Sequence, residues 1–215
     1  MQEVLARLKR YFADKQFSIL VLQSVVLFVF SMVVHYTAGV FATEKASNAV
    51  TDLLLGRLPV VDTSVIFIEG NILFWVLIIV LSILEPKRIP FVLKSLSVFM
   101  LTRAFFVTMT HLGTDPRQIV LPVNSILDKF TFGGDLFFSG HTGAPFLMAL
   151  VFWRHPYLRW IFLTASVIFG ASVLLGHQHY SIDVFAAFFI AYGIYHIALK
   201  LFEEDHQLFL QGLEN

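Results

Sequence analysis

The stretch "LLGHQHYSIDVFAAFF" at residues 174–189 joins a polar turn to the start of an apolar run, and it decides how the chain folds. Its second half is apolar enough to begin a membrane helix, whereas its first half holds His177, His179 and Asp183. Insertion scales give a penalty of roughly 2.5–3.5 kcal/mol for a charged residue at the centre of a bilayer. We therefore expect these side chains at the end of a membrane helix, either as interfacial caps or as part of a site.

The rest of the chain is also strongly apolar. Of its 215 residues, 57% are hydrophobic and only 14% are charged, and the mean hydropathy is +0.77. This composition predicts an all-α polytopic membrane protein. The net charge is +0 and there is no basic tail, which argues against a nucleic-acid partner. The absence of cysteine excludes disulfides, thiol catalysis and cysteine-based metal sites.

Apolar segments of about 20 residues, the length that crosses a bilayer core, divide the chain. Six segments qualify or nearly qualify: 17–42, 66–84, 91–109, 136–153, 157–176 and 182–202. We expect residues 1–16 to form an N-terminal amphipathic interfacial helix, 17–202 the six-helix transmembrane catalytic domain, and 203–215 a C-terminal tail.

The distribution of Lys and Arg predicts the orientation, because short cytoplasmic joints collect these residues. With the N-terminus inside, ten of the 15 fall on the cytoplasmic side and five on the outside. The outer set is Lys45, Arg57, Arg103, Arg117 and Lys129. Under this topology Arg103, His141, His179 and Asp183 all reach the non-cytoplasmic face, where we expect the active site.

Two histidine-containing stretches then suggest phosphoryl transfer. His179 and Asp183 are four residues apart, so on a helix the carboxylate can orient the imidazole. In "GGDLFFSGHTGAP" at 133–145, Ser139 and Gly140 precede His141 at a helix start, where backbone N–H groups favour an anion. One histidine can attack phosphorus and the other can protonate the leaving alkoxide, while Arg103 and the amides stabilise the equatorial oxygens.

At this point the sequence resembles a known family. "FSGHT" at 138–142 and "HYSIDV" at 179–184 resemble the two histidine motifs of the type-2 phosphatidic acid phosphatase superfamily, in particular its sphingomyelin-synthase branch. Phe138 stands where the superfamily usually has Pro, and Val173 stands at its usual Arg position. Sphingomyelin synthases share these departures and also carry Gly-Asp ahead of the second motif, as at Gly134–Asp135 here.

The resemblance implies a six-helix fold with His179 as nucleophile, Asp183 as its orienter and His141 as general acid. It also implies a phospholipid or sphingolipid substrate, with water or an alcohol as acceptor and no cofactor. Without the third-motif Arg, anion binding falls to Arg103 and the helix-start amides. We expect Ser139, Gly140 and Asp135 to assist substrate binding, although Asp135 could equally cap the fourth helix.

Other interpretations remain open from the sequence. His177 suits a supporting or solvated position, and Glu69 is either a functional carboxylate or the ion-pair partner of Arg103. A different function class, a histidine-based metal transporter or metal-binding membrane protein, would use the same histidines with Asp183. The one-sided placement of these ligands and the nearby Arg103 count against that alternative, so we expect no metal. The sequence does not predict the oligomeric state.

Overall fold

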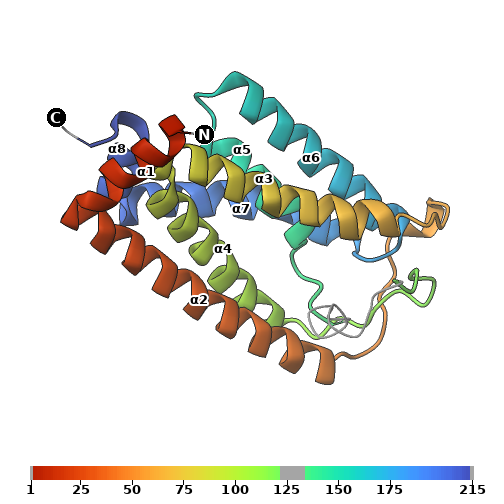
Figure 1. The fold of residues 1–215 in the computed structure, drawn as a ribbon. Helices are drawn as coiled ribbons and strands as arrows, with labels where there is room; N and C mark the ends of the chain where they lie inside the picture. The colour runs from red at the N-terminus through yellow and green to blue at the C-terminus, as the bar shows by residue number, and fades with distance from the viewer. Residues whose placement is uncertain (1, 122–133, 214–215) are drawn as a thin grey trace.

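The fold is described by a computed structural model covering residues 2–121 and 134–213, and in these residues every regular element is helical (Figure 1). The α-helices are α1 (Gln2–Ala13), α2 (Lys15–Glu44), α3 (Asn71–Leu84), α4 (Ile89–Met109), α5 (Gly140–Val151), α6 (Pro156–Leu175), α7 (Ser181–Leu201) and α8 (Glu203–Gln211). Single-turn helices η1 (Leu55–Arg57), η2 (Ile66–Gly70) and η3 (Pro86–Arg88) lie in or beside the connections.

Five stretches of helix in the described residues are long and apolar enough to cross a membrane. They are Lys15–Glu44, Ile66–Leu84, Pro86–Met109, Pro156–Leu175 and Ser181–Leu201. The prediction of an all-helical polytopic membrane protein is therefore confirmed. Each stretch matches a predicted segment to within a few residues, because uninterrupted apolar length is the signal that the bilayer imposes.

The sixth predicted segment, 136–153, forms a shorter helix than expected. Helix α5 has 12 residues, and at about 1.5 Å per residue it reaches only about 18 Å, less than the ~30 Å bilayer core. Nine of its residues are buried, and it packs against α6 and α7. The apolar character of this segment therefore reflects burial within the bundle, and the predicted count of six spans is not confirmed.

The chain alternates between two ends of the bundle. Both termini lie at one end in Figure 1, which we call the terminal end. The connections 45–65, 110–121, 134–139 and 176–180 lie at the opposite end, which we call the loop end. The start of α5 and the start of α7 both face the loop end, so the two histidine motifs come together there.

The predicted C-terminal tail is in fact partly helical. Helix α8 packs against α4 and α7 at the terminal end, and Phe209 is part of the main hydrophobic core. A buried ion pair fixes it, with Lys94 Nζ 2.6 Å from Asp205 Oδ2. Helix α8 was not predicted from the sequence because its first turn is acidic and it shows no continuous apolar face. Its buried side chains are only Asp205 and Phe209 among its described residues.

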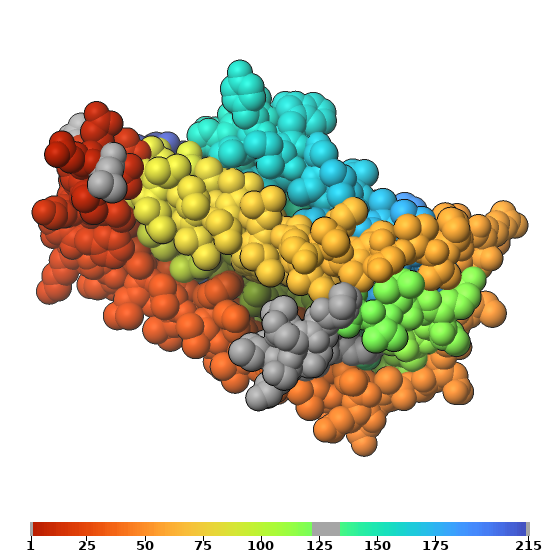
Figure 2. All heavy atoms as spheres, turned by 45° about the vertical axis from the view of Figure 1, so that its right-hand side comes forward, coloured from red at the N-terminus to blue at the C-terminus, as the bar shows by residue number. Residues whose placement is uncertain are grey.

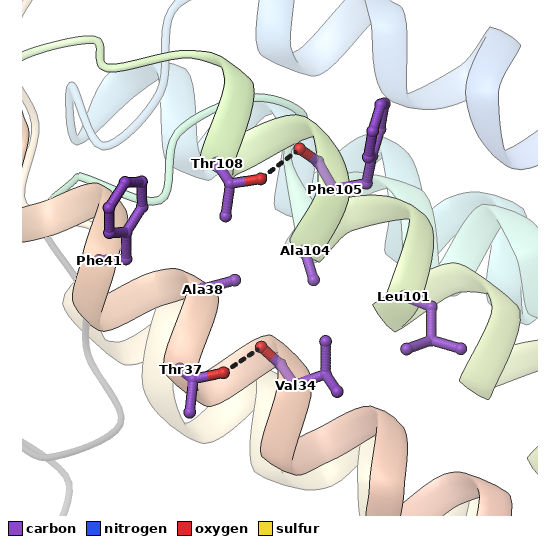
Figure 3. Close-up of a pocket in the computed structure, with 8 residues that line it drawn as sticks. All are labelled: Val34, Thr37, Ala38, Phe41, Leu101, Ala104, Phe105 and Thr108. Carbon is purple, nitrogen blue, oxygen red and sulfur yellow. Dashed lines mark hydrogen bonds between the residues drawn. The ribbon is translucent and has the colours of Figure 1, made fainter.

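A shallow groove runs between α2 and α4 on the outside of the bundle (Figure 3). Its volume is about 400 Å³, and its lining is mainly apolar: Val34, Thr37, Ala38, Phe41, Leu101, Ala104, Phe105 and Thr108. No titratable side chain lines it, so it offers no chemistry. The catalytic candidates lie elsewhere, at the loop end.

Candidate active site

The first half of the site is the start of α5. Ser139 is its N-cap residue, and the Thr142 N–H donates to Ser139 Oγ at 3.4 Å. Gly140 and His141 form the first turn, where backbone N–H groups have no partner within the helix. A Cβ atom on Gly140 would lie 3.4 Å from Arg103 Nε, so the guanidinium packs directly against the helix start.

His141 is held between aromatic rings. Its imidazole stacks on Phe67 of η2 with ring centroids 3.9 Å apart, and Phe169 meets it edge-on at 6.3 Å. Its Nε2 atom is buried without a hydrogen-bond partner among the described residues. Burial, together with the nearby charges of His179 and Arg103, lowers the pKa of the His141 imidazole to about 3 when no anion is bound. The ring is therefore fixed in position while one nitrogen remains available to a ligand.

The second half of the site lies in the turn before α7. His179 Nδ1 is 3.4 Å from Asp183 Oδ2, and both side chains are buried. The same carboxylate oxygen accepts the Tyr180 N–H at 2.9 Å. His179 precedes the helix, so this contact does not arise from two residues on one helical face, as we had expected. It arises because Asp183, in the first turn of α7, reaches back to the residues before the helix.

One hydrogen bond joins the two halves directly. The Ser139 N–H donates to the Asp183 carbonyl at 3.0 Å. The N-cap of α5 and the first turn of α7 are thus fixed to one another, although 44 positions separate them in the sequence. Together with the packing of α5 against α7, this bond holds the segments that carry His141 and His179 against each other.

Arg103 of α4 connects the loop before α5 to the bundle. Its Nε donates to the Phe138 carbonyl at 2.8 Å, its Nη1 lies 2.8 Å from Asp135 Oδ2, and its Nη2 bonds the Asp135 carbonyl. His35 of α2 lies 3.1 Å from Nη1. Asp135 is thus the ion-pair partner of Arg103 and does not cap a helix, while Glu69 is exposed and makes no described pair with Arg103.

The turn between α6 and α7 has an unusual residue at its centre. His177 has φ of +53°, in the left-handed region, and its side chain is buried. Its N–H donates to the Leu174 carbonyl and the Gln178 N–H to the Val173 carbonyl, which is the hydrogen-bond pattern that closes many helices. His177 Nδ1 lies 3.5 Å from Asp115 Oδ2. His177 is therefore a buried turn residue and is not solvated.

The loops of the loop end fasten the start of α7. Asp52 Oδ2 accepts the Ser181 N–H at 2.7 Å and the Ser181 hydroxyl at 2.8 Å. The Tyr180 hydroxyl donates to the Gly113 carbonyl at 2.7 Å. Partial burial opposes the charge on Asp52, but hydrogen bonds from Leu55 and Ser181 outweigh it and hold the pKa of this carboxyl below its usual value. Asp52 thus caps α7 from a distant segment.

The 110–121 loop carries its own ion pair. Asp115 binds Arg117 through Nε and Nη2 at 3.1 and 3.0 Å. The hydrogen bonds from Arg117, opposed by partial burial and aided by His177, lower the pKa of Asp115 to about 2. The carboxylate beside the buried His177 is therefore ionised throughout the physiological range.

Comparisons with known proteins address the same part of the chain. Residues 133–200 match the family described as PAP2 superfamily C-terminal, a range that begins just before the α5 motif and ends within α7. This part of the chain, about a third of its length, is therefore similar to the PAP2 superfamily.

A curated relative supports the branch of the PAP2 superfamily that the sequence resembles. The chain is 37% identical over 111 residues to the phosphatidylinositol:ceramide inositolphosphotransferase of Trypanosoma cruzi (strain CL Brener). The alignment covers 43% of this chain and 33% of the relative, so the chain matches about a third of that protein's length. No solved structure matches the chain. The predicted resemblance to the PAP2 superfamily and its sphingomyelin-synthase-like branch is confirmed over the residues that these comparisons cover.

Both departures from the usual PAP2 motifs are buried. Val173, at the usual Arg position, is fully buried, and its carbonyl accepts the N–H groups of Gln178 and His179. Phe138, at the usual Pro position, is also fully buried, and its carbonyl binds Arg103. The guanidinium group beside the start of α5 belongs to Arg103 of the neighbouring helix α4.

Three contributors to the site were not identified from the sequence. His35 contacts Arg103, Phe67 stacks on His141, and Asp52 caps α7. A histidine inside the apolar 17–42 segment was the available signal for His35, because ionisable residues in membrane helices are usually functional. Phe67 is one of 24 phenylalanines, and nothing in the sequence distinguishes it.

A metal site was the rival interpretation of these residues. Within residues 2–121 and 134–213, no group of three or more His, Asp or Glu side chains is arranged to hold a metal ion. His177 and His179 face different partners, Asp115 and Asp183 respectively.

Proposed function

We propose that this protein is an integral-membrane lipid phosphotransferase or phosphatase that cleaves a lipid phosphoester through a phosphohistidine intermediate on His179. The observation that carries the proposal is the Ser139 N–H to Asp183 carbonyl bond, which ties the His141 helix to the His179 turn. The match of residues 133–200 to the PAP2 superfamily supports the same chemistry.

In the first step, His179 Nε2 attacks phosphorus and the bond from phosphorus to the lipid alcohol oxygen breaks. Asp183, 3.4 Å from Nδ1, holds the ring and stabilises the positive charge that develops on it. The negative charge of the bound phosphate favours protonation of His141, which then donates its proton to the departing alkoxide, so the lipid alcohol leaves neutral. The phosphoryl group, with any headgroup it carries, is then bound to the nitrogen of His179.

In the second step, the acceptor hydroxyl gives its proton to His141 and its oxygen attacks phosphorus. The bond between nitrogen and phosphorus breaks, and His179 returns to its starting state. Water as acceptor gives hydrolysis, and a lipid alcohol gives transfer. The name of the Trypanosoma cruzi relative, which specifies a ceramide acceptor, favours transfer to a lipid alcohol in this chain as well.

Anion binding is the role that we propose for the start of α5. The first-turn amides at Gly140 and His141 lie at the positive end of the helix, and such ends bind phosphate. Arg103 adds positive charge beside Gly140 while its hydrogen bonds to the 135–138 segment hold that loop in place. Ser139 fixes the helix start, and Asp135 orients Arg103.

We further propose that this chemistry occurs at the non-cytoplasmic face. The connections at the terminal end carry most of the Lys and Arg residues, including Lys87 and Arg88 just before α4 and Arg154 between α5 and α6. The positive-inside rule then assigns the terminal end to the cytoplasm and the loop end to the opposite side. The substrate is accordingly a lipid of the outer leaflet.

The test is a product assay with the purified full chain in lipid-containing micelles. Mass spectrometry would follow phosphatidic acid and phosphatidylinositol, each with and without ceramide, in the presence of EDTA. We expect release of lipid alcohol in EDTA from wild type and from His155→Ala, a matched control at the terminal end. His179→Ala should lose at least about 10³-fold in rate, the scale on which nucleophile loss acts.

Two results would overturn the proposal. Full activity in folded His179→Ala would exclude this nucleophile. Activity that disappears in EDTA and returns with added zinc would favour the metal-dependent alternative.

A further inference from the structure

A second pocket lies at the terminal end, away from the candidate active site. It has a volume of about 460 Å³ and forms where α1 meets the turn after α3. Figure 2 shows α1, in red, against the yellow end of α3 and the turn that follows it. The pocket is lined by Ala6, Arg7, Arg10, Tyr11, Glu85 and Lys87.

The lining of this pocket is positively charged. Three cations, Arg7, Arg10 and Lys87, face one carboxylate, Glu85. Arg7 already pairs with Glu85 and donates to the Leu84 carbonyl. Lys87 Nζ donates to the Leu210 carbonyl at 3.1 Å, and this contact positions the ammonium group. Cations therefore outnumber carboxylates in the lining of the pocket, and this charge balance favours an anionic ligand.

The surface beside the pocket is apolar and faces away from the bundle. Val76, Val80 and Ile83 of α3 are exposed and lie three to four residues apart, so they form one row on the helix, and the exposed Leu84 follows this row directly before Glu85. On α1, Leu5 and Phe12 are also exposed. A headgroup in the pocket would place its acyl chains along this row, whereas a free anion would leave the row unused.

We propose that this pocket binds the headgroup of an anionic phospholipid whose chains lie along α3. The charges match a phosphate group, and the position at the end of the membrane helices matches the headgroup layer. The lipid would join α1 to the α3–α4 turn. It would not be a substrate, because the pocket and the histidines lie at opposite ends of the bundle.

Native mass spectrometry of the full chain in detergent tests this proposal, with phosphatidylglycerol and phosphatidylcholine as probes. We expect the first phosphatidylglycerol molecule to bind more tightly than phosphatidylcholine. The double variant Arg10→Gln/Lys87→Gln should bind phosphatidylglycerol roughly 30-fold more weakly, since about 1 kcal/mol for each basic residue corresponds to roughly fivefold. Binding of phosphatidylcholine should not change.

Matched variants separate the pocket from general surface charge. Lys9→Gln/Lys15→Gln removes two cations from the same region but outside the pocket lining, and it should bind phosphatidylglycerol as wild type does. Arg10→Lys/Lys87→Arg keeps both charges and should retain binding, which controls for the Leu210 contact. Circular dichroism would verify that each variant is folded.

Three results would each overturn the proposal. One is unchanged phosphatidylglycerol binding in folded Arg10→Gln/Lys87→Gln. Another is an equal loss in Lys9→Gln/Lys15→Gln, which would indicate diffuse electrostatics. The third is glycerol 3-phosphate binding as tightly as phosphatidylglycerol, because the pocket would then select a soluble phosphate. This readout is independent of enzymatic activity, so it does not depend on the proposed reaction.

Discussion

His177 shows how a single residue can shape the turn that carries the nucleophile. A side chain in the left-handed region is strained, and a β-branched side chain is strained most. Because φ is +53° here, we expect His177→Gly to be more stable than His177→Val by about 1–2 kcal/mol. Unfolding of both variants in detergent, followed by circular dichroism, measures this difference. Equal stabilities would mean that the buried imidazole, and not the backbone, determines the effect of substitution.

At the same scale, His141 should matter most when the leaving group is a poor one. If His141 protonates the departing alkoxide, His141→Ala should lose about 10²–10⁴-fold in rate with an ordinary lipid ester. With a nitrophenyl phosphate ester the loss should be clearly smaller, because that leaving group needs little protonation. Steady-state rates on the two substrates measure the contrast. An equal loss on both would assign His141 to anion binding or structure instead.

The residue-level site was only partly predictable. The sequence motifs predicted His141, His179 and Asp183 as candidate site residues, and the structure brings the segments that carry them together. The ion pair between Arg103 and Asp135 was missed because the two residues are far apart in the sequence. Only the fold of the loop before α5 determines that these two charges meet. Asp52 was missed for the same reason, since its partner Ser181 is 129 positions away.

The start of α7 is capped by a side chain from a distant segment of the chain. Asp52→Ala removes the acceptor for two donors of Ser181, so we expect a loss of about 0.5–2 kcal/mol in stability, as for a helix N-cap, together with a lower kcat. Asp62→Ala is the matched control, because Asp62 is exposed in the same connection and its hydrogen bonds to described residues go to the neighbouring Ser64. A similar effect of the two substitutions would exclude a specific role for Asp52.

The pH dependence of this cap follows from the lowered pKa of Asp52. A carboxyl group whose pKa is lower in the folded than in the unfolded protein stabilises the fold at pH values above its unfolded pKa, here 3.8. This stabilisation is lost as the pH falls below that value. The stability difference between wild type and Asp52→Ala should therefore be constant near neutral pH and shrink below about pH 3.8. Melting temperatures measured across this range give the comparison.

Helices were predictable to the extent that the bilayer determined them. The five long apolar helices follow directly from hydropathy, since backbone polar groups in lipid must be satisfied within the helix. Helix α5 was predicted too long because a buried core helix and a lipid-facing one look alike in composition. Helix α8 was missed because its stability depends on the buried contact between Lys94 and Asp205.

For the whole molecule, the orientation in the membrane determines which lipids the site can reach. The chain has no cysteine, so Lys45→Cys at the loop end and Arg154→Cys at the terminal end provide single labelling sites, both of them exposed. With an impermeant maleimide on intact cells, we expect labelling at 45 and protection at 154. The opposite pattern would place the chemistry in the cytoplasm and reverse the proposed localisation.

The central claim concerns the molecule as a catalyst, namely that a phosphoryl group passes through His179. The most direct measurement is rapid denaturation of the enzyme during turnover of a substrate labelled at phosphorus, followed by peptide mapping of the bound label. We predict an acid-labile, base-stable label on the peptide containing His179 in wild type and in His155→Ala, and no label in folded His179→Ala. Label that persists in His179→Ala, or that maps to His141, would contradict this account.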